Sequence, residues 1–135
     1  MPEARQVLCA GSAAGDVLAL QEPLSFWGGF DAADGTIVDP SHPQVGARLT
    51  GRIVLMRGGR GSSSASSVLA EAIRQGTAPA ALVLQESDEI IALGAIVADE
   101  LYGIAMPVVI VDADDYDHIA RASHVTVTGA SITVG

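Results

Sequence analysis

The residues of this chain best suited to chemistry lie in one short segment, Arg57-Gly58-Gly59-Arg60-Gly61-Ser62-Ser63-Ser64. An apolar run precedes it and a helical pattern follows it. A glycine turn leading onto a helix N-terminus brings unpaired backbone N–H groups and the positive end of the helix dipole together, where they favour an anion. Arg60 adds a planar cationic fork, and glycine lets the backbone approach a ligand closely. A tight turn with a serine cap explains the same spacing, so both interpretations stay open.

Two familiar phosphate-binding motifs are excluded for this segment. A Walker loop needs Gly-Lys-Ser or Gly-Lys-Thr after the glycines, and the chain has none there. A dinucleotide fingerprint needs a third glycine where Ser64 stands.

Other chemically capable side chains are scattered. The histidines His42, His118 and His124 have no partner at metal-ligand spacing. His42 lies in a proline-containing turn and is the one we consider near a site, although a role in the loop is the simpler interpretation. Trp27 and Phe30 flank a Gly-Gly pair. We expect them to pack in the core, with a lid over a substrate as the alternative.

Composition narrows the function classes. The chain has 135 residues, 7 basic and 16 acidic, for a net charge of −9. Nucleic acids and anionic membrane surfaces both need clustered cations, so neither is an expected partner. The single cysteine, Cys9, cannot form an internal disulfide or hold an iron–sulfur cluster or thiolate zinc site by itself. No apolar stretch reaches the ~18 residues of a membrane span, and no secretion signal is evident, so we expect a cytoplasmic location.

The elements that would position the glycine segment alternate strand and helix, which predicts one compact α/β domain over residues 1–135. Apolar runs predict strands over 52–56, 81–84 and 107–111. Helices are expected from the serine run to Gly76, over 88–101 with an interruption or bend near Gly94, and over 113–122. Short strands over 7–10 and 17–20, split by a loop over 11–16, precede a turn-rich stretch, and 124–134 predicts a closing hairpin.

Five segments, in this order, resemble one known family. They are Leu24-Ser25-Phe26-Trp27-Gly28-Gly29-Phe30-Asp31, His42-Pro43, Gly51-Arg52-Ile53-Val54-Leu55, Gly58-Gly59-Arg60-Gly61-Ser62-Ser63-Ser64 and Ala78-Pro79-Ala80-Ala81. This pattern resembles the small subunit, or swivelling domain, of the aconitase X family, from about Gly11 to Val111.

The resemblance implies a single swivelling β/β/α domain, like the aconitase swivel, that closes over a metal centre in a large aconitase X subunit. Family members are hydro-lyases: bacterial ones resemble cis-3-hydroxy-L-proline dehydratases and archaeal ones mevalonate 5-phosphate dehydratases. By resemblance, Ser62 is the proton-abstracting base, and Arg60, Gly61 and Ser63 line the substrate end. No cofactor is expected on this chain, and an iron–sulfur cluster or iron is expected in the large subunit.

Two other functions are weighed against this one. Phosphohistidine carriers share a glycine turn before a helix but need a histidine there, and Ser62-Ser63-Ser64-Ala65 has none. A non-catalytic anion-binding or interaction module would keep the glycine turn and lack a metal-bearing partner. For the substrate, a phosphate would call for several cations, yet only Arg57 and Arg60 lie near the turn. We therefore favour cis-3-hydroxy-L-proline over mevalonate 5-phosphate.

Overall fold

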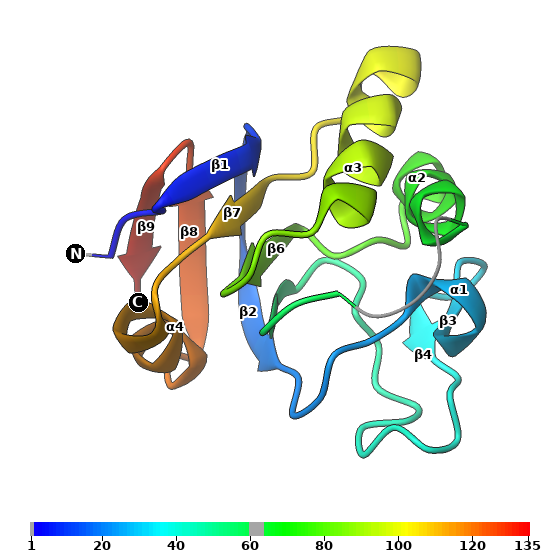
Figure 1. Ribbon diagram of the computed structural model, residues 1–135, viewed down its shortest axis with the longest axis horizontal. Helices are drawn as coiled ribbons and strands as arrows, with labels where there is room; N and C mark the ends of the chain where they lie inside the picture. Colours follow the sequence, from blue (N-terminus) through cyan, green and yellow to red (C-terminus); the bar gives the residue numbers. More distant parts are fainter. Residues whose placement is uncertain (1, 60–63) are drawn as a thin grey trace.

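A mixed, curled sheet forms the centre of the computed structural model, which describes residues 2–59 and 64–135 (Figure 1). Within these residues the sheet has seven strands in the order β1-β7-β6-β5-β2-β8-β9. Their bounds are β1 Gln6–Cys9, β2 Ser12–Ala19, β5 Ile53–Met56, β6 Ala81–Leu84, β7 Val108–Ile110, β8 His124–Thr128 and β9 Ser131–Val134. Strands β2, β5, β6 and β7 run parallel, whereas β1, β8 and β9 pair with antiparallel neighbours.

The two edges of this sheet meet. The segment just before β1 pairs with β9 through an antiparallel bridge between Glu3 and Ser131. The backbone N–H of Ala4 donates to the carbonyl of Ala130 at 2.8 Å. The chain start therefore lies beside β9, as Figure 1 shows, and covers an edge that would otherwise expose unpaired backbone groups.

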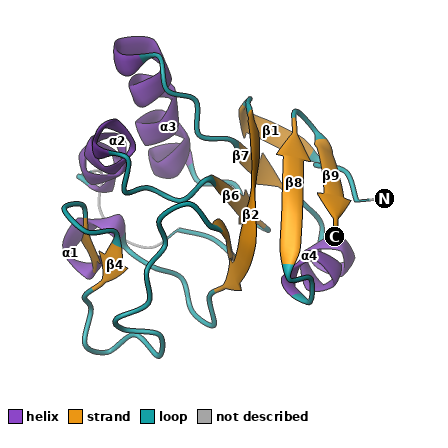
Figure 2. Ribbon diagram, turned by 180° about the vertical axis from the view of Figure 1, so that it is seen from behind, coloured by secondary structure: helices purple, strands orange, loops and turns teal. Residues whose placement is uncertain are grey.

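Both faces of the central strands are buried, which explains their unbroken apolar runs. In β5, Val54 and Met56 face a core shared with helices α2 (Ala65–Gln75) and α3 (Glu89–Tyr102). Ile53 and Leu55 face a second core shared with helix α4 (Ala113–Ala120) and the β8–β9 hairpin. Figure 2 shows α2 and α3 on one side of the sheet and α4 on the other.

A small lobe packs beside α2. It consists of α1 (Phe26–Gly29) and the paired short strands β3 (Phe30–Asp31) and β4 (Thr36–Ile37). The rings of Phe26 and Phe30 meet edge to face, 5.2 Å apart, and both side chains are buried. The lobe joins the core of α2 and α3 rather than forming one of its own.

Most expected elements are confirmed, including the helix that ends at Gly76 and the closing hairpin. Two expectations are wrong. Residues 12–16 are not a loop but the first part of β2, because they pair with β8. Gly15 is needed there because a Cβ at this position would lie 2.5 Å from the carbonyl oxygen of Gly51. Helix α3 runs through Gly94 without interruption, since this glycine allows close contact with α2: a Cβ there would lie 2.8 Å from the Ser66 oxygen.

Helix lengths bear on membrane insertion as well. In residues 2–59 and 64–135, no helix is both long enough and apolar enough to cross a membrane.

Candidate functional site

The candidate site is the turn between β5 and α2, at the edge of the sheet where the parallel strands end. Arg60, Gly61, Ser62 and Ser63 lie outside the described residues, so their roles stay predictions. The structure does describe both sides of the turn: Arg57 to Gly59 after β5, and Ser64 before α2. The carboxyl ends of the parallel strands β5, β6 and β7 lie together at this edge.

The N-terminus of α2 is held rigidly by packing, with Ala65, Leu69 and Ala72 buried against the core. Its first turn has no acidic residue, and the side chain of Ser64 makes no capping hydrogen bond. The backbone carbonyl of Ser64 accepts from the N–H of Ser67 at 3.2 Å. Ser64 therefore stands at the N-cap position without a capping bond from its side chain, and this helix end keeps the positive dipole that favours an anion.

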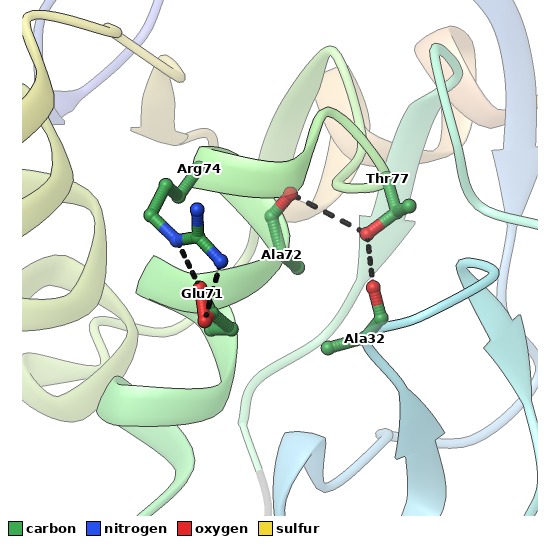
Figure 3. Close-up of polar contacts among 5 residues, drawn as sticks. All are labelled: Ala32, Glu71, Ala72, Arg74 and Thr77. Atoms are coloured by element: carbon green, nitrogen blue, oxygen red, sulfur yellow. Dashed lines mark hydrogen bonds and ion pairs between the residues drawn. The ribbon is translucent and has the colours of Figure 1, made fainter.

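The far end of α2 is tied to the small lobe (Figure 3). The hydroxyl of Thr77 donates to the Ala32 carbonyl at 2.6 Å and also lies 3.4 Å from the Ala72 carbonyl. Arg74 pairs with Glu71 one turn back on the same helix. Arg74 is thereby engaged at the end of α2 opposite the candidate site.

The loop that follows β6 is hydrogen-bonded to the start of the glycine turn. The carbonyl of Arg57 accepts hydrogen bonds from the backbone N–H groups of Gln85 (3.1 Å) and Glu86 (2.7 Å). Asp88 caps α3 by accepting from the N–H groups of Ile90 and Ile91 at 2.9 and 3.0 Å.

Gly59 lies directly against this cap. A Cβ at Gly59 would stand 1.7 Å from Oδ2 of Asp88, so position 59 has no room for any side chain. Gly59 is thus required by close packing against the start of α3, beyond its use as a flexible turn residue.

Arg57 is the arginine at this edge that lies within the described residues. Its Nη1 donates to Oε1 of Gln85 at 2.6 Å, and its guanidinium carbon lies 5.2 Å from the centroid of the Tyr116 ring. Burial raises the pKa of Tyr116, and the nearby Arg57 charge opposes that shift. Sequence reasoning noted Arg57 as a nearby cation but missed Gln85 and Tyr116, because only the sheet order brings these distant segments together.

His42 has a structural role in its loop. The ring is buried, and its Nδ1 accepts from the backbone N–H of Gln44 at 3.0 Å. The proton therefore sits on Nε2, which donates to the Glu22 carbonyl at 3.1 Å. Of the other histidines, His118 lies on α4 and His124 contacts Asp16 at 3.3 Å.

The two aromatic candidates have different environments. Phe30 packs in the core, as expected. Trp27 does not: the residue is 58% exposed, and the backbone angles of Trp27 and Gly28 are not helical.

In the part of the chain that the structure describes, no group of three or more His, Cys, Asp or Glu side chains comes together to hold a metal ion.

With this geometry established, comparison with known proteins identifies the fold. The family model described as "Aconitase X swivel domain" matches residues 3–134. The chain belongs to the aconitase X swivel-domain family. The crystal structure of Thermococcus kodakaraensis aconitase X in its holo-form superimposes with a TM-score of 0.83 at 27% identity, covering 99% of this chain and 97% of that one. The β/β/α swivel architecture inferred from the sequence is confirmed.

Curated relatives include proteins named cis-3-hydroxy-L-proline dehydratase and phosphomevalonate dehydratase small subunit. A cis-3-hydroxy-L-proline dehydratase of Pseudomonas aeruginosa is 52% identical over 103 residues, which is 76% of this chain and 18% of that protein. A phosphomevalonate dehydratase small subunit of Methanothrix thermoacetophila is 34% identical over 127 residues, covering 92% of this chain and 93% of that one. The chain spans about a fifth of the length of the cis-3-hydroxy-L-proline dehydratases from Pseudomonas aeruginosa and Hypocrea jecorina, 18% and 21%.

Proposed function

We propose that this chain is the swivel domain of a hydro-lyase that dehydrates a small hydroxy acid and that it supplies the base. The observation that carries this proposal is the family match over residues 3–134, together with relatives that are named dehydratases. The buried strand β5 and the well-packed helix α2, which lie on either side of the candidate segment, are consistent with it.

We favour cis-3-hydroxy-L-proline as the substrate. A relative of that name shares 52% identity, against 45% for a phosphomevalonate dehydratase small subunit of Methanopyrus kandleri. Charge supports the same choice. A phosphate is bound best by several cations, whereas Arg57 and Arg60 are the arginines of the β5–α2 segment in a chain of net charge −9.

The proposed enzyme needs a partner that carries the metal. Relatives of similar length are named small subunits, which implies a large subunit. We propose that an iron–sulfur cluster or iron belongs to that partner, since Cys9 is the chain's one cysteine and is buried. A free thiol also fits the reducing cytoplasm that we propose as the location.

Within this chain, the proposed chemistry is a proton transfer. Ser62, as its alkoxide, takes the proton from the carbon beside the substrate carboxylate and becomes a hydroxyl. The electron pair of that C–H bond forms the new carbon–carbon double bond, and the β-hydroxyl leaves as hydroxide with the electrons of its C–O bond. A serine alkoxide needs positive surroundings. The N-terminus of α2 supplies a dipole of the right sign, and Arg60, Gly61 and Ser63 are proposed to face the substrate.

The test replaces Ser62 in the complex reconstituted with its large partner. Ser62→Ala should lower turnover by about 10²–10⁴-fold, the usual contribution of a positioned general base, and leave complex formation intact. Ser64→Ala is the matched control, because its hydroxyl makes no capping bond. It should change neither turnover nor melting temperature.

Two outcomes would contradict the proposal. If Ser62→Ala keeps more than about a tenth of wild-type turnover, below the range of a general base, Ser62 is not the base. If the chain elutes alone when co-expressed with a large aconitase X subunit, it is instead a non-catalytic anion-binding module.

A further inference from the structure

The arginines of this chain are distributed unevenly around the sheet. Of those that the structure describes, only Arg57 follows a parallel strand at its carboxyl end. The others lie before β1 or β5 or on or after a helix: Arg5, Arg48, Arg52, Arg74 and Arg121. Several of these are already engaged. Arg52 donates to the Val17 carbonyl, Arg74 pairs with Glu71, and Arg121 donates to the Asp117 carbonyl.

The Arg57 side chain is held from two sides. Gln85 accepts from Nη1 at 2.6 Å, and the ring of Tyr116 lies under the guanidinium, with 5.2 Å from Cζ to its centroid. The buried position of Tyr116 on α4 makes this ring a rigid support. An arginine fixed in this way loses little further side-chain entropy when it binds a ligand.

Arg57 still has donors to offer. A guanidinium carries five N–H groups in one plane, and the bond to Gln85 uses one of them. The residue is exposed, and among the described residues no carboxylate forms an ion pair with it. A planar fork of N–H donors is the group that binds a carboxylate through two parallel hydrogen bonds.

We propose that Arg57 binds the carboxylate of the hydroxy acid substrate, and this rests on the proposed function. Gln85 and Tyr116 are positioning residues that orient the guanidinium. Removing the proton beside a carboxylate places negative charge on the carboxylate oxygens, so a fixed cation at that point also favours the transition state. Arg57 directly follows β5 and lies two residues before Gly59, at the start of the proposed catalytic turn.

The experiment uses the reconstituted complex and two inhibitors, L-proline and L-prolinamide, which differ in the carboxylate. The inhibition constants of both are measured for the wild type, Arg57→Gln, Arg57→Lys and Arg48→Gln. For each variant, the inhibition constant of L-prolinamide is divided by that of L-proline. Intrinsic differences between the two inhibitors cancel when this ratio is compared between variants. Arg48→Gln is the control because Arg48 is also exposed but lies before β5, so it makes the same charge change elsewhere.

We expect Arg57→Gln to reduce the wild-type preference for L-proline by roughly 10- to 100-fold, the value of charge-assisted hydrogen bonds to a carboxylate. Arg57→Lys keeps the charge and loses the fork, so it should fall between the wild type and Arg57→Gln. Arg48→Gln should leave the ratio unchanged. A merely structural role of Arg57 would lower the melting temperature and weaken both inhibitors equally.

The failures are distinguishable. If the wild-type complex is active and both Arg57 variants have the same ratio of inhibition constants as the wild type, only the assignment of Arg57 is overturned. An unchanged ratio with weaker binding of the large partner shows instead that Arg57 contacts a carboxylate of that partner. A wild-type complex that neither dehydrates a hydroxy acid nor binds L-proline overturns the proposed function and this assignment together.

Discussion

Replacing Gly59 by alanine tests how the candidate turn is fixed to the rest of the fold. An added Cβ would lie 1.7 Å from Oδ2 of Asp88 and 2.7 Å from its Cγ, whereas real Cβ contacts essentially never fall below 3.0 Å. Gly59 does not have a left-handed backbone, so alanine meets no conformational strain there. Most of the effect should therefore come from the clash with Asp88, since the next neighbour, Cδ1 at the flexible end of the Ile91 side chain, would lie 3.1 Å from the added Cβ.

The size of the effect follows from what must move. Either the Asp88 carboxylate leaves the N–H groups of Ile90 and Ile91, or the turn shifts away from α3. Losing the cap costs about 0.5–2 kcal/mol, and overpacking a tight contact costs about 1–3 kcal/mol. We expect Gly59→Ala to lower the free energy of unfolding by about 1–3 kcal/mol, or the melting temperature by roughly 3–10 °C.

A double-mutant cycle isolates the contact. Asp88→Ala alone should cost about 0.5–2 kcal/mol through the lost cap. Once the carboxylate is gone, adding Gly59→Ala should cost at most about 0.5 kcal/mol more, so the two changes are strongly non-additive. Urea denaturation of the four proteins measures the cycle.

Gly58→Ala is the matched control for this cycle. Its Cβ would approach only the exposed end of Glu86, at 3.2 Å, and that side chain can move aside. We expect a change within about 0.5 kcal/mol. Additive costs for Gly59→Ala and Asp88→Ala would refute the reasoning, as would equal costs for the two glycine variants.

Two further predictions concern buried groups away from the turn. His42→Ala removes two hydrogen bonds and a buried ring, so it should lower the free energy of unfolding by about 2–4 kcal/mol in urea denaturation. Turnover per folded complex should stay unchanged. Lost turnover at normal stability would contradict the structural role of His42. Burial raises the pKa of Tyr116 above its ordinary 10.0, so the unfolded chain ionises first and stability falls as pH rises above that value. Tyr116→Phe should flatten this alkaline fall in pH-dependent urea denaturation, and equal slopes for the two proteins would count against it.

Local pattern alone determined much of this protein. The apolar runs 52–56, 81–84 and 107–111 predict buried strands, and strands lie at 53–56, 81–84 and 108–110 with both faces covered. Gly76 marked the end of α2 because a left-handed residue, with φ of 82°, stands there. The glycine and serine residues around position 60, with the segments beside them, were enough to indicate the aconitase X family.

Tertiary structure decided what local pattern could not. Residues 12–16 have the composition of a loop, yet they form a strand because β8 supplies hydrogen-bond partners and Gly51 needs the space beside Gly15. Gly94 suggests a helix break in sequence, but the close approach of α2 requires it within a continuous α3. The aromatic residue types alone also did not show that Phe26 is buried whereas its neighbour Trp27 is exposed.

The surroundings of Arg57 show this division most clearly. Sequence reasoning placed a cation beside the glycine turn. The Gln85 and Tyr116 side chains that hold it come from the loop after β6 and from α4, which are 28 and 59 residues further along the chain. Parallel pairing of β5 with β6 aligns their carboxyl ends, and α4 covers the face toward which Ile53 and Leu55 point. Contacts between segments so far apart depend on strand order and on which face a helix covers, and both are set only when the sheet assembles.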